Sequence, residues 1–371
     1  MIRLISKIIA IWLCGAGFAN AATMSITFSG YTAGKETLTN FPAMVQLGTN
    51  IQGFLYSQFT STSGWDLRFK SGSTELNYEI ETWGVTGNNN SYVWVQIPLL
   101  TNGTVITASW GDATKIQQAY TTNGATWNSN YKGVWHLPNG TTLTVNDSTA
   151  NKNHGVPLAG ATIVATNGLV DGAAYFDGAS GGIDVNYPSL NLTGDFTVSA
   201  WVKTVDTNAL YEIFDNGMYS SGYMLFVSPG GKLKAQEWSG SWTSVDSVNT
   251  VTTGQWAYAT ATRVNGGTLT VYLNGQYDNS IASSGTIVFG ALQKPVIGAF
   301  FVPPAYRPPT HGAVMKGLID EFQVSSVAQS SNWVWACYQN MASNSVFNTY
   351  GPITIGRIPY YSNQLGYDNQ Q

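Results

Sequence analysis

Apolar and polar residues alternate with a period of two along most of the chain. In the region from residue 25 to about residue 120, the runs at 76–81 and 92–97 alternate strictly, and Gly-Asn-Asn-Asn at 87–90 predicts a hairpin turn between them. This alternation is typical of strands with one buried face and one solvated face. About a hundred residues of this kind predict a small β-sandwich.

A second region of alternation runs from about residue 127 to residue 350. Residues 196–203 and 269–273 predict strands, and the second run ends in Asn274 and Gly275, a strong signal for a tight turn. Many short strands at this spacing favour a larger sandwich or jelly roll. The sequence predicts one convincing helix, on which the apolar face contains Val334, Cys337 and Met341.

These patterns predict an all-β protein of two sandwich domains with one short C-terminal helix. We expect a signal peptide at 1–21, a small β-sandwich at 22–122, a larger jelly roll at 123–351 and a C-terminal tail at 352–371. A frayed tail is the simplest interpretation of the last segment. The alternative is a segment that adds a strand to the sheet edge of a neighbouring molecule, and so supports self-association.

The first residues have the pattern of a signal peptide. Arg3 and Lys7 precede an apolar run at 8–18, and Ala-Asn-Ala at 19–21 is a small-residue cleavage pattern. The apolar run is shorter than the roughly 20 residues that a membrane-spanning helix needs. Cys14 lacks the small preceding residue expected next to a lipidated cysteine. The sequence therefore predicts a secreted or cell-envelope protein, in the periplasm or at the outer surface, with no transmembrane segment after cleavage.

Composition narrows the possible partners. Charged residues make up 10% of the chain, aromatic residues 13%, and the formal net charge is −4. Without a basic stripe, nucleic acid is a poor partner. Cleavage of the signal peptide would leave Cys337 as the single cysteine, so we expect no internal disulfide and interpret this thiol as a small buried hydrophobe.

Two sets of motifs resemble known families. The second region resembles laminin-G-like, concanavalin A-like jelly rolls through GVWHL at 133–137, DSTANKNHG at 147–155, AYFDG at 174–178, DFTVSAWV at 195–202, LNG at 273–275, GLIDEFQVS at 317–325 and NWVWACY at 332–338. The first region resembles the domain of unknown function 2341 through DLRF at 66–69, LNYEIETW at 76–83, YVWVQIP at 92–98 and ASWG at 108–111. The tandem implies an exported, bacterial cell-surface setting; one sandwich fold, however, hosts lectins, adhesion modules and hydrolases.

Glu79 and Glu81 are the residues that most suggest an enzyme. At positions i and i+2 of a strand they share one face, and relaxed side chains at that spacing approach the separation of about 5–5.5 Å that retaining glycosidases use. The third acid of the E-x-D-x-E pattern of concanavalin A-like glucanases is missing, so we interpret the pair as a solvated strand face. The three histidines show no metal-ligand spacing, and we assign no catalytic residue.

Calcium is the cofactor that the laminin-G-like resemblance implies, as a structural ion. The same resemblance gives the candidate ligands, Asp147, Asp177 and Asp320. Such loop carboxylates suit Ca²⁺, which takes 6–8 oxygen ligands. The alternative is that Asp147 caps a turn and that Asp320 or Glu321 pairs with Lys316.

Aromatic residues in loops suggest carbohydrate binding. Trp238 and Trp242 lie among small polar residues, and Phe301 and Tyr306 lie in or beside a proline-rich stretch. The indole pair fits either a core or an exposed platform, whereas Trp135, Trp201 and Trp256 are interpreted as core residues of the sheets.

We therefore expect an exported, non-catalytic binding or adhesion protein that recognises a polysaccharide or a surface protein. The alternatives are a structural subunit of a cell-surface assembly and a glycoside hydrolase on the larger sandwich.

Overall fold

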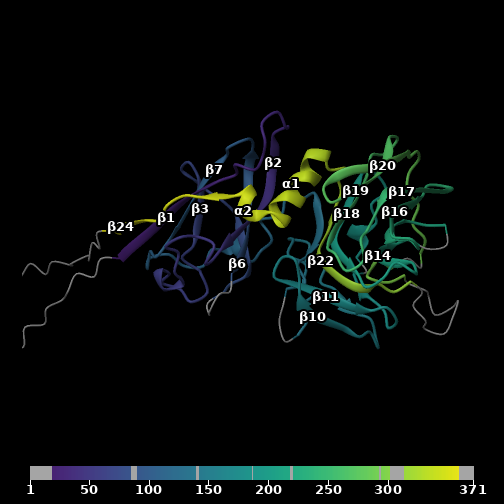
Figure 1. The fold of residues 1–371 in the computed structure, drawn as a ribbon, viewed down its shortest axis with the longest axis horizontal. Coiled ribbons are helices and arrows are strands. Elements are labelled where there is room, and N and C mark those ends of the chain that lie inside the picture. Colours follow the sequence, from purple (N-terminus) through teal and green to yellow (C-terminus); the bar gives the residue numbers. More distant parts are fainter. Residues whose placement is uncertain are drawn as a thin grey trace, which may run out of the picture.

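The computed structural model describes residues 19–84, 90–138, 142–185, 187–217, 220–291, 294–300 and 313–358. Figure 1 shows two β-sheet bodies side by side, with the C-terminal helices between them. The expected all-β sandwich architecture is confirmed.

The N-terminal body is built from two antiparallel sheets. A six-stranded sheet has the order β23-β1-β7-β3-β4, with β24 also paired to β1, and a three-stranded sheet has the order β2-β6-β5. The strands are β1 (Ala19–Thr27), β2 (Leu38–Leu47), β3 (Arg68–Ser71), β4 (Thr74–Glu75), β5 (Tyr78–Thr82), β6 (Ser91–Leu100), β7 (Val105–Trp110), β23 (Thr349–Tyr350) and β24 (Thr354–Ile358).

The larger body contains an eight-stranded sheet of order β10-β11-β22-β13-β18-β19-β20, with β8 also paired to β22. Its strands are β8 (Tyr131–Trp135), β10 (Ile163–Asn167), β11 (Gly172–Asp177), β13 (Phe196–Thr204), β18 (Ala257–Arg263), β19 (Thr268–Leu273), β20 (Gln276–Ala282) and β22 (Lys316–Ser325).

A seven-stranded sheet of order β17-β16-β15-β14-β21-β12-β9 packs against it. Its strands are β9 (Val156–Pro157), β12 (Ile183–Asp184), β14 (Tyr211–Asn216), β15 (Tyr223–Val227), β16 (Lys232–Trp238), β17 (Trp242–Thr250) and β21 (Val296–Ile297).

The predicted turn between β19 and β20 is confirmed. Asn274 and Gly275 both have positive φ, 52° and 74°, which is the backbone of the tight hairpin turn that Asn-Gly favours. The turn predicted at 87–90 falls largely on residues outside the described part of the chain.

The predicted C-terminal helix is also confirmed. Helix α1 (Ser331–Ala342) begins at Ser330, whose hydroxyl accepts a hydrogen bond from the Trp333 amide, and α2 (Asn344–Phe347) follows it. Short 3-10 helices occur at η1 (Tyr56–Gln58), η2 (Ala119–Thr121) and η3 (Pro188–Leu190). Cys337 is buried on α1, and burial raises the pKa of its thiol to about 12, as expected of a packing residue. No helix within the described residues is long and apolar enough to span a bilayer.

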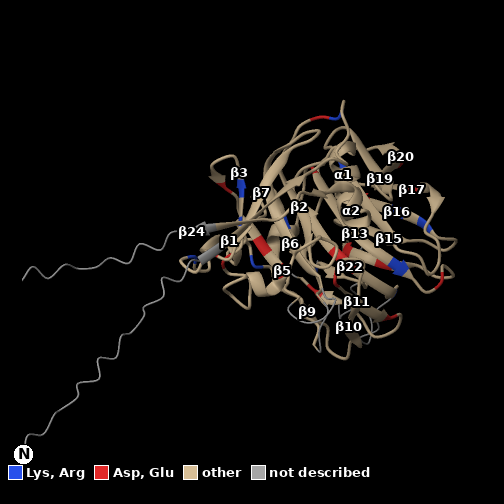
Figure 2. Cartoon of the chain, turned by 60° about the vertical axis from the view of Figure 1, so that its left-hand side comes forward, with Lys and Arg blue, Asp and Glu red and all other residues tan. Residues whose placement is uncertain are grey.

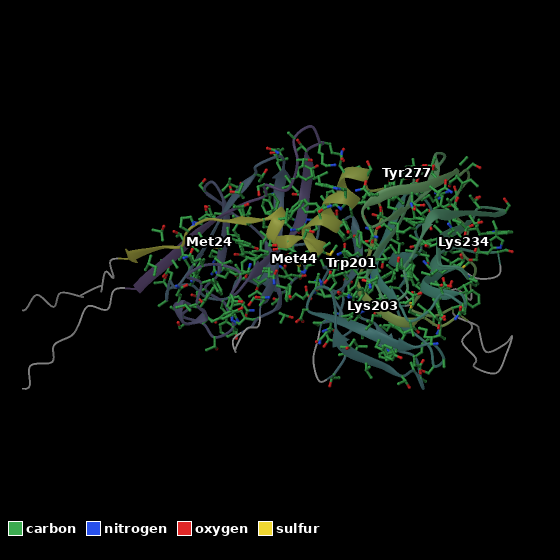
Figure 3. The ribbon with its side chains drawn as sticks, in the orientation of Figure 1. Met24, Met44, Trp201, Lys203, Lys234 and Tyr277 are labelled. Atoms are coloured by element: carbon green, nitrogen blue, oxygen red, sulfur yellow. The ribbon has the colours of Figure 1, made fainter. Side chains whose placement is uncertain are left out.

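Helix α1 lies in the seam between the two bodies. On one side Trp201 of β13 donates its indole N–H to the sulfur of Met341. On the other side Asn340, Asn344 and Asn348 all donate side-chain amide protons to the carbonyl of Met44 in β2. Figure 3 shows Met44 and Trp201 near the middle of the molecule. One buried apolar cluster therefore includes residues of the N-terminal body, of α1 and of the larger body's outer face.

The beginning of the C-terminal tail is ordered against the same chain. Strand β24 pairs with residues 19–23 of β1, and β23 pairs with residues 26 and 27. The interpretation of the tail as frayed from residue 352 is therefore wrong for 354–358. These residues form backbone hydrogen bonds with the edge of β1. Residues 359–371 lie outside the described part of the chain.

Candidate functional site

The polar face of β5 and β6 is buried where the two bodies meet. Asn77 and Gln96 donate to the carbonyl of Ala125, and Trp127 donates its indole N–H to Glu79 over 2.8 Å. The interpretation of Glu79 and Glu81 as a solvated strand face is therefore wrong. The alternation correctly separates the apolar face of these strands from the polar face. The polar face is nevertheless buried, because the segment with Ala125 and Trp127 covers it.

His136, which directly follows β8, binds carboxylates on both sides. Its Nε2 lies 2.7 Å from Glu79 Oε1, and its Nδ1 lies 2.8 Å from Glu321 Oε1 and 3.6 Å from Glu81 Oε2. We call Glu79, Glu81, His136, Asp320 and Glu321 the junction cluster. Figure 2 shows how sparsely charged residues are spread over the chain, so four carboxyl groups in one place are unusual here.

Two tryptophans hold the junction cluster in place. Trp94 donates its indole N–H to Glu81 Oε2 over 2.8 Å, as Trp127 does to Glu79. The ring of Trp94 also stacks on His136, with centroids 5.4 Å apart and planes at 25°. The indoles therefore orient both carboxylates and one face of the imidazole.

A bulge in β22 sets the directions of the other two carboxyl groups, those of Asp320 and Glu321. The register between β13 and β22 shifts between Ser199 and Trp201, and Glu321 opposite this shift has φ of 51°. Positive φ is strained for glutamate and persists only where the surroundings hold it. Asp320 turns the other way, and its Oδ2 accepts hydrogen bonds from the amides of Leu169 and Val170.

Burial and mutual repulsion shift the ionisation of the junction cluster. Burial, followed by the charge of Glu321, raises the pKa of Glu81 and of Asp320 well above the usual range. Burial alone would lower the pKa of His136, but the carboxylates of Glu321 and Glu81 more than offset it, so the pKa of His136 is raised well above its usual value. Burial and the charge of Glu321 therefore oppose ionisation of Glu81 and Asp320, whereas the carboxylates favour the charged form of His136.

Three residues of the junction cluster border a pocket, whereas Asp320 and Glu321 are fully buried. Glu79, Glu81 and His136 line a pocket with a volume of about 290 Å³, and Lys152 and His154 also line it. Glu81 also borders a second pocket, beside Trp65 and Trp83. Small solutes and ions therefore have a route to Glu81 and His136.

The three predicted calcium ligands lie in different surroundings. Both oxygens of Asp147 accept hydrogen bonds, from the amides of Val134, Thr149 and Asn153 and from the Thr149 hydroxyl. Asp177 accepts from the amide of Ser180 and from its hydroxyl. Within the described residues, the cluster with metal-ligand geometry is Glu81, His136 and Glu321, which includes none of the three aspartates. Calcium stays a prediction.

The pairing of Asp320 or Glu321 with Lys316 is wrong. The ammonium group of Lys316 lies 2.9 Å from Asp206 instead. Glu321 contacts His136, and Asp320 accepts hydrogen bonds from backbone amides.

The predicted indole pair lies outside the core. Trp238 and Trp242 face each other across the end of the β16–β17 hairpin, with ring centroids 5.3 Å apart and planes at 69°, and Trp242 is 37% exposed. Of the three tryptophans assigned to the core, Trp135 and Trp201 are buried, whereas Trp256 is only partly buried against it. Phe301 and Tyr306 lie outside the described residues.

A polar strip continues from the indoles along the outer face of β16 and β17. Gln236 lies opposite Ser244, and Lys234 lies opposite Asp246 with its ammonium group 3.3 Å from the carboxylate. The alternate residues of β16 face inward and are buried. The hairpin therefore presents two indoles followed by hydrogen-bonding side chains.

A buried ion pair anchors this hairpin from behind. The Arg263 guanidinium contacts the Glu237 carboxylate, and both side chains are fully buried. Ser283 donates its hydroxyl to the same carboxylate, and Arg263 also donates to the carbonyls of Gly194 and Gly285. All these groups are paired, so the residue next to Trp238 is held rigidly.

We expect Glu237→Gln to lower the free energy of unfolding by about 3–5 kcal/mol, because the change leaves the Arg263 charge buried and unpaired. The matched control is Asp246→Asn, which removes the exposed partner of Lys234 on the same hairpin and is expected to cost at most about 1 kcal/mol. Urea unfolding of both variants checks the difference. Equal effects would contradict the role given to the buried pair.

Comparison with known proteins agrees with the β-sandwich. A family model described as the concanavalin A-like lectin/glucanases superfamily matches residues 177–334. No curated protein matches the chain.

Solved structures give distant similarities. Domain 4 of AbnA, a GH43 extracellular arabinanase from Geobacillus stearothermophilus, in complex with arabinotriose, is 22% identical; the match covers 57% of this chain and 98% of that one, with a TM-score of 0.45. The binding domain of Paraclostridial Mosquitocidal Protein 1 is 17% identical, over 57% of this chain and 52% of that one, with a TM-score of 0.46. The Ruminococcus gnavus IT-sialidase CBM40 bound to alpha2,3 sialyllactose is 12% identical, over 45% and 96%, with a TM-score of 0.39. The chain thus spans about half of the binding domain of the mosquitocidal protein. Residues 177–334 resemble the concanavalin A-like lectin/glucanases superfamily.

Proposed function

We propose that this protein is an exported, non-catalytic glycan-binding protein, and that Trp238 and Trp242 form its sugar-binding platform. The observation that carries the proposal is the pair of indoles outside the core, beside the polar strip on β16 and β17. Phe301 and Tyr306 belong to the proposal as further aromatic contacts.

The chemistry of a saccharide matches this surface. A sugar ring has apolar C–H faces and hydroxyl edges, so it binds best where a flat aromatic ring lies next to donors and acceptors. Gln236, Ser244 and Asp246 supply both kinds of group within four residue pairs of the indoles. The buried Glu237–Arg263 pair reduces the cost of ordering the hairpin on binding.

Export and envelope association are part of the proposal. Cleavage after Ala21 would keep all of the pairing between β1 and β7, which starts at Ala22, but would remove three of the five pairs between β1 and β24. We also propose the domain boundary at residue 122, the relationship of 22–122 to the domain of unknown function 2341, and a structural Ca²⁺. The larger domain would end before residue 349 and not at 351, because β23 pairs with β1 of the N-terminal body.

The test is binding of residues 22–371 to a panel of plant and bacterial polysaccharides, followed by Trp238→Ala and Trp242→Ala. We expect each change to weaken binding by about two- to tenfold, the range that one aromatic contact contributes. Quenching of tryptophan fluorescence or a glycan array measures the affinity. The control is Tyr277→Ala, which removes a 58% exposed aromatic side chain from another strand of the same body.

Retention on no glycan would refute the sugar part of the proposal. Retention that is unchanged in both tryptophan variants would place the binding surface elsewhere. If Tyr277→Ala weakens binding as much as Trp242→Ala, the effect comes from general loss of aromatic surface.

A structural subunit of a surface assembly is the second candidate, and the pairing of β24 favours it. Five residues of β1 lie opposite β24, and cleavage after Ala21 would remove three of them. Strand β24 would then keep two partners in its own chain and have backbone groups free to pair with a neighbouring molecule.

Truncation after Gly351 tests this second candidate. We expect residues 22–371 to form a larger species than residues 22–351 in light scattering, because only the longer chain contains β24. The same mass for both chains would dismiss strand exchange through the tail.

A further inference from the structure

We propose that Glu81, His136 and Glu321 form a binding site for one divalent transition-metal ion, with Zn²⁺ as the ion that fits best. The site lies at the junction between the two bodies, and its three ligands come from β5, from the residue after β8 and from β22. It is separate from the proposed glycan platform.

The ligand atoms are already close to the spacing that an ion needs. One atom from each residue lies within 4.8 Å of the others. His136 Nδ1 is 2.8 Å from Glu321 Oε1 and 3.6 Å from Glu81 Oε2. Ligands in a tetrahedral zinc site are about 3.4 Å apart, given bonds of about 2.0–2.2 Å, so small side-chain movements would complete the site.

One buried oxygen points to a missing partner. Glu81 Oε2 accepts the indole N–H of Trp94, whereas Glu81 Oε1 is buried without a hydrogen-bond partner, and the side chain is only 1% exposed. An unpaired carboxylate oxygen in such a place is unfavourable. A bound cation would supply the interaction that this oxygen lacks.

The surrounding residues form the outer shell that metal-binding histidines usually have. Glu79 Oε1 lies 2.7 Å from His136 Nε2, so the imidazole can go on donating from Nε2 while a bound ion displaces the proton from Nδ1 and takes its lone pair. Trp127 in turn donates to Glu79, and Trp94 donates to Glu81. The orientation of two ligands is thus fixed by groups that do not touch the ion.

The donor set selects the class of ion. One imidazole nitrogen with two carboxylates suits Zn²⁺ and neighbouring first-row metals, whereas Ca²⁺ prefers 6–8 oxygen ligands. Glu81 and His136 line the pocket described above, which gives an ion a route from solvent. A bound ion would connect the two bodies directly.

The experiment uses residues 22–371, purified without a histidine tag and treated with a chelator, and titrates Zn²⁺ by calorimetry. We expect one ion per chain. Loss of a ligand in Glu81→Gln or His136→Gln should weaken binding more than Glu79→Gln, which alters only the outer shell and should cost about 10–100-fold. The control is Glu212→Gln, which changes a buried carboxyl group of β14 outside the site and should leave the Zn²⁺ affinity unchanged.

Circular dichroism confirms that each variant is folded, and visible absorption of the wild-type chain with Co²⁺ provides a readout that needs no variant. A tetrahedral Co²⁺ spectrum that Zn²⁺ abolishes and Ca²⁺ does not is the expected result. No Zn²⁺ binding by the wild-type chain, or binding that is equally tight in His136→Gln, would overturn the proposal. Displacement by Ca²⁺ at similar concentration would overturn the assignment of the ion class.

Discussion

The hydrogen bonds from His136 to Glu79 and Glu321 are the interaction on which the rest of the structure depends. One carboxylate belongs to the N-terminal body and the other to the larger body, so the imidazole binds both across the seam. Buried carboxyl groups are tolerated only where a positive charge or a donor faces them. Both hydrogen bonds form only in one relative placement of the two bodies. The pairing therefore specifies how the bodies pack against each other.

The junction leaves the far side of the larger body free for recognition. The β16–β17 hairpin presents the two indoles, and the fully buried Glu237–Arg263 pair holds it. Helix α1 covers the opposite sheet through Trp201 and the asparagines that bind Met44. The proposed platform and the junction therefore lie on different faces, so changes at the platform are expected to leave the junction intact.

Local patterns in the sequence predicted much of the fold but not the junction cluster. Alternation and the Asn274–Gly275 pair predicted strands and a turn, because these depend on neighbouring residues. His136 lies 57 residues from Glu79 and 185 from Glu321, and no periodicity connects positions so far apart. The signal that was present is Trp94: an indole on a face taken as solvated, together with Gln96, indicates a covered surface.

The measurement that tests this account most directly is differential scanning calorimetry of residues 22–371 and of the His136→Gln variant. If the junction joins the bodies into one unit, the wild-type chain unfolds in a single transition whose calorimetric and van't Hoff enthalpies agree, and the variant shows two transitions. Two independent transitions in the wild-type chain would contradict the account. So would a His136→Gln variant that unfolds in the same single transition as the wild-type chain.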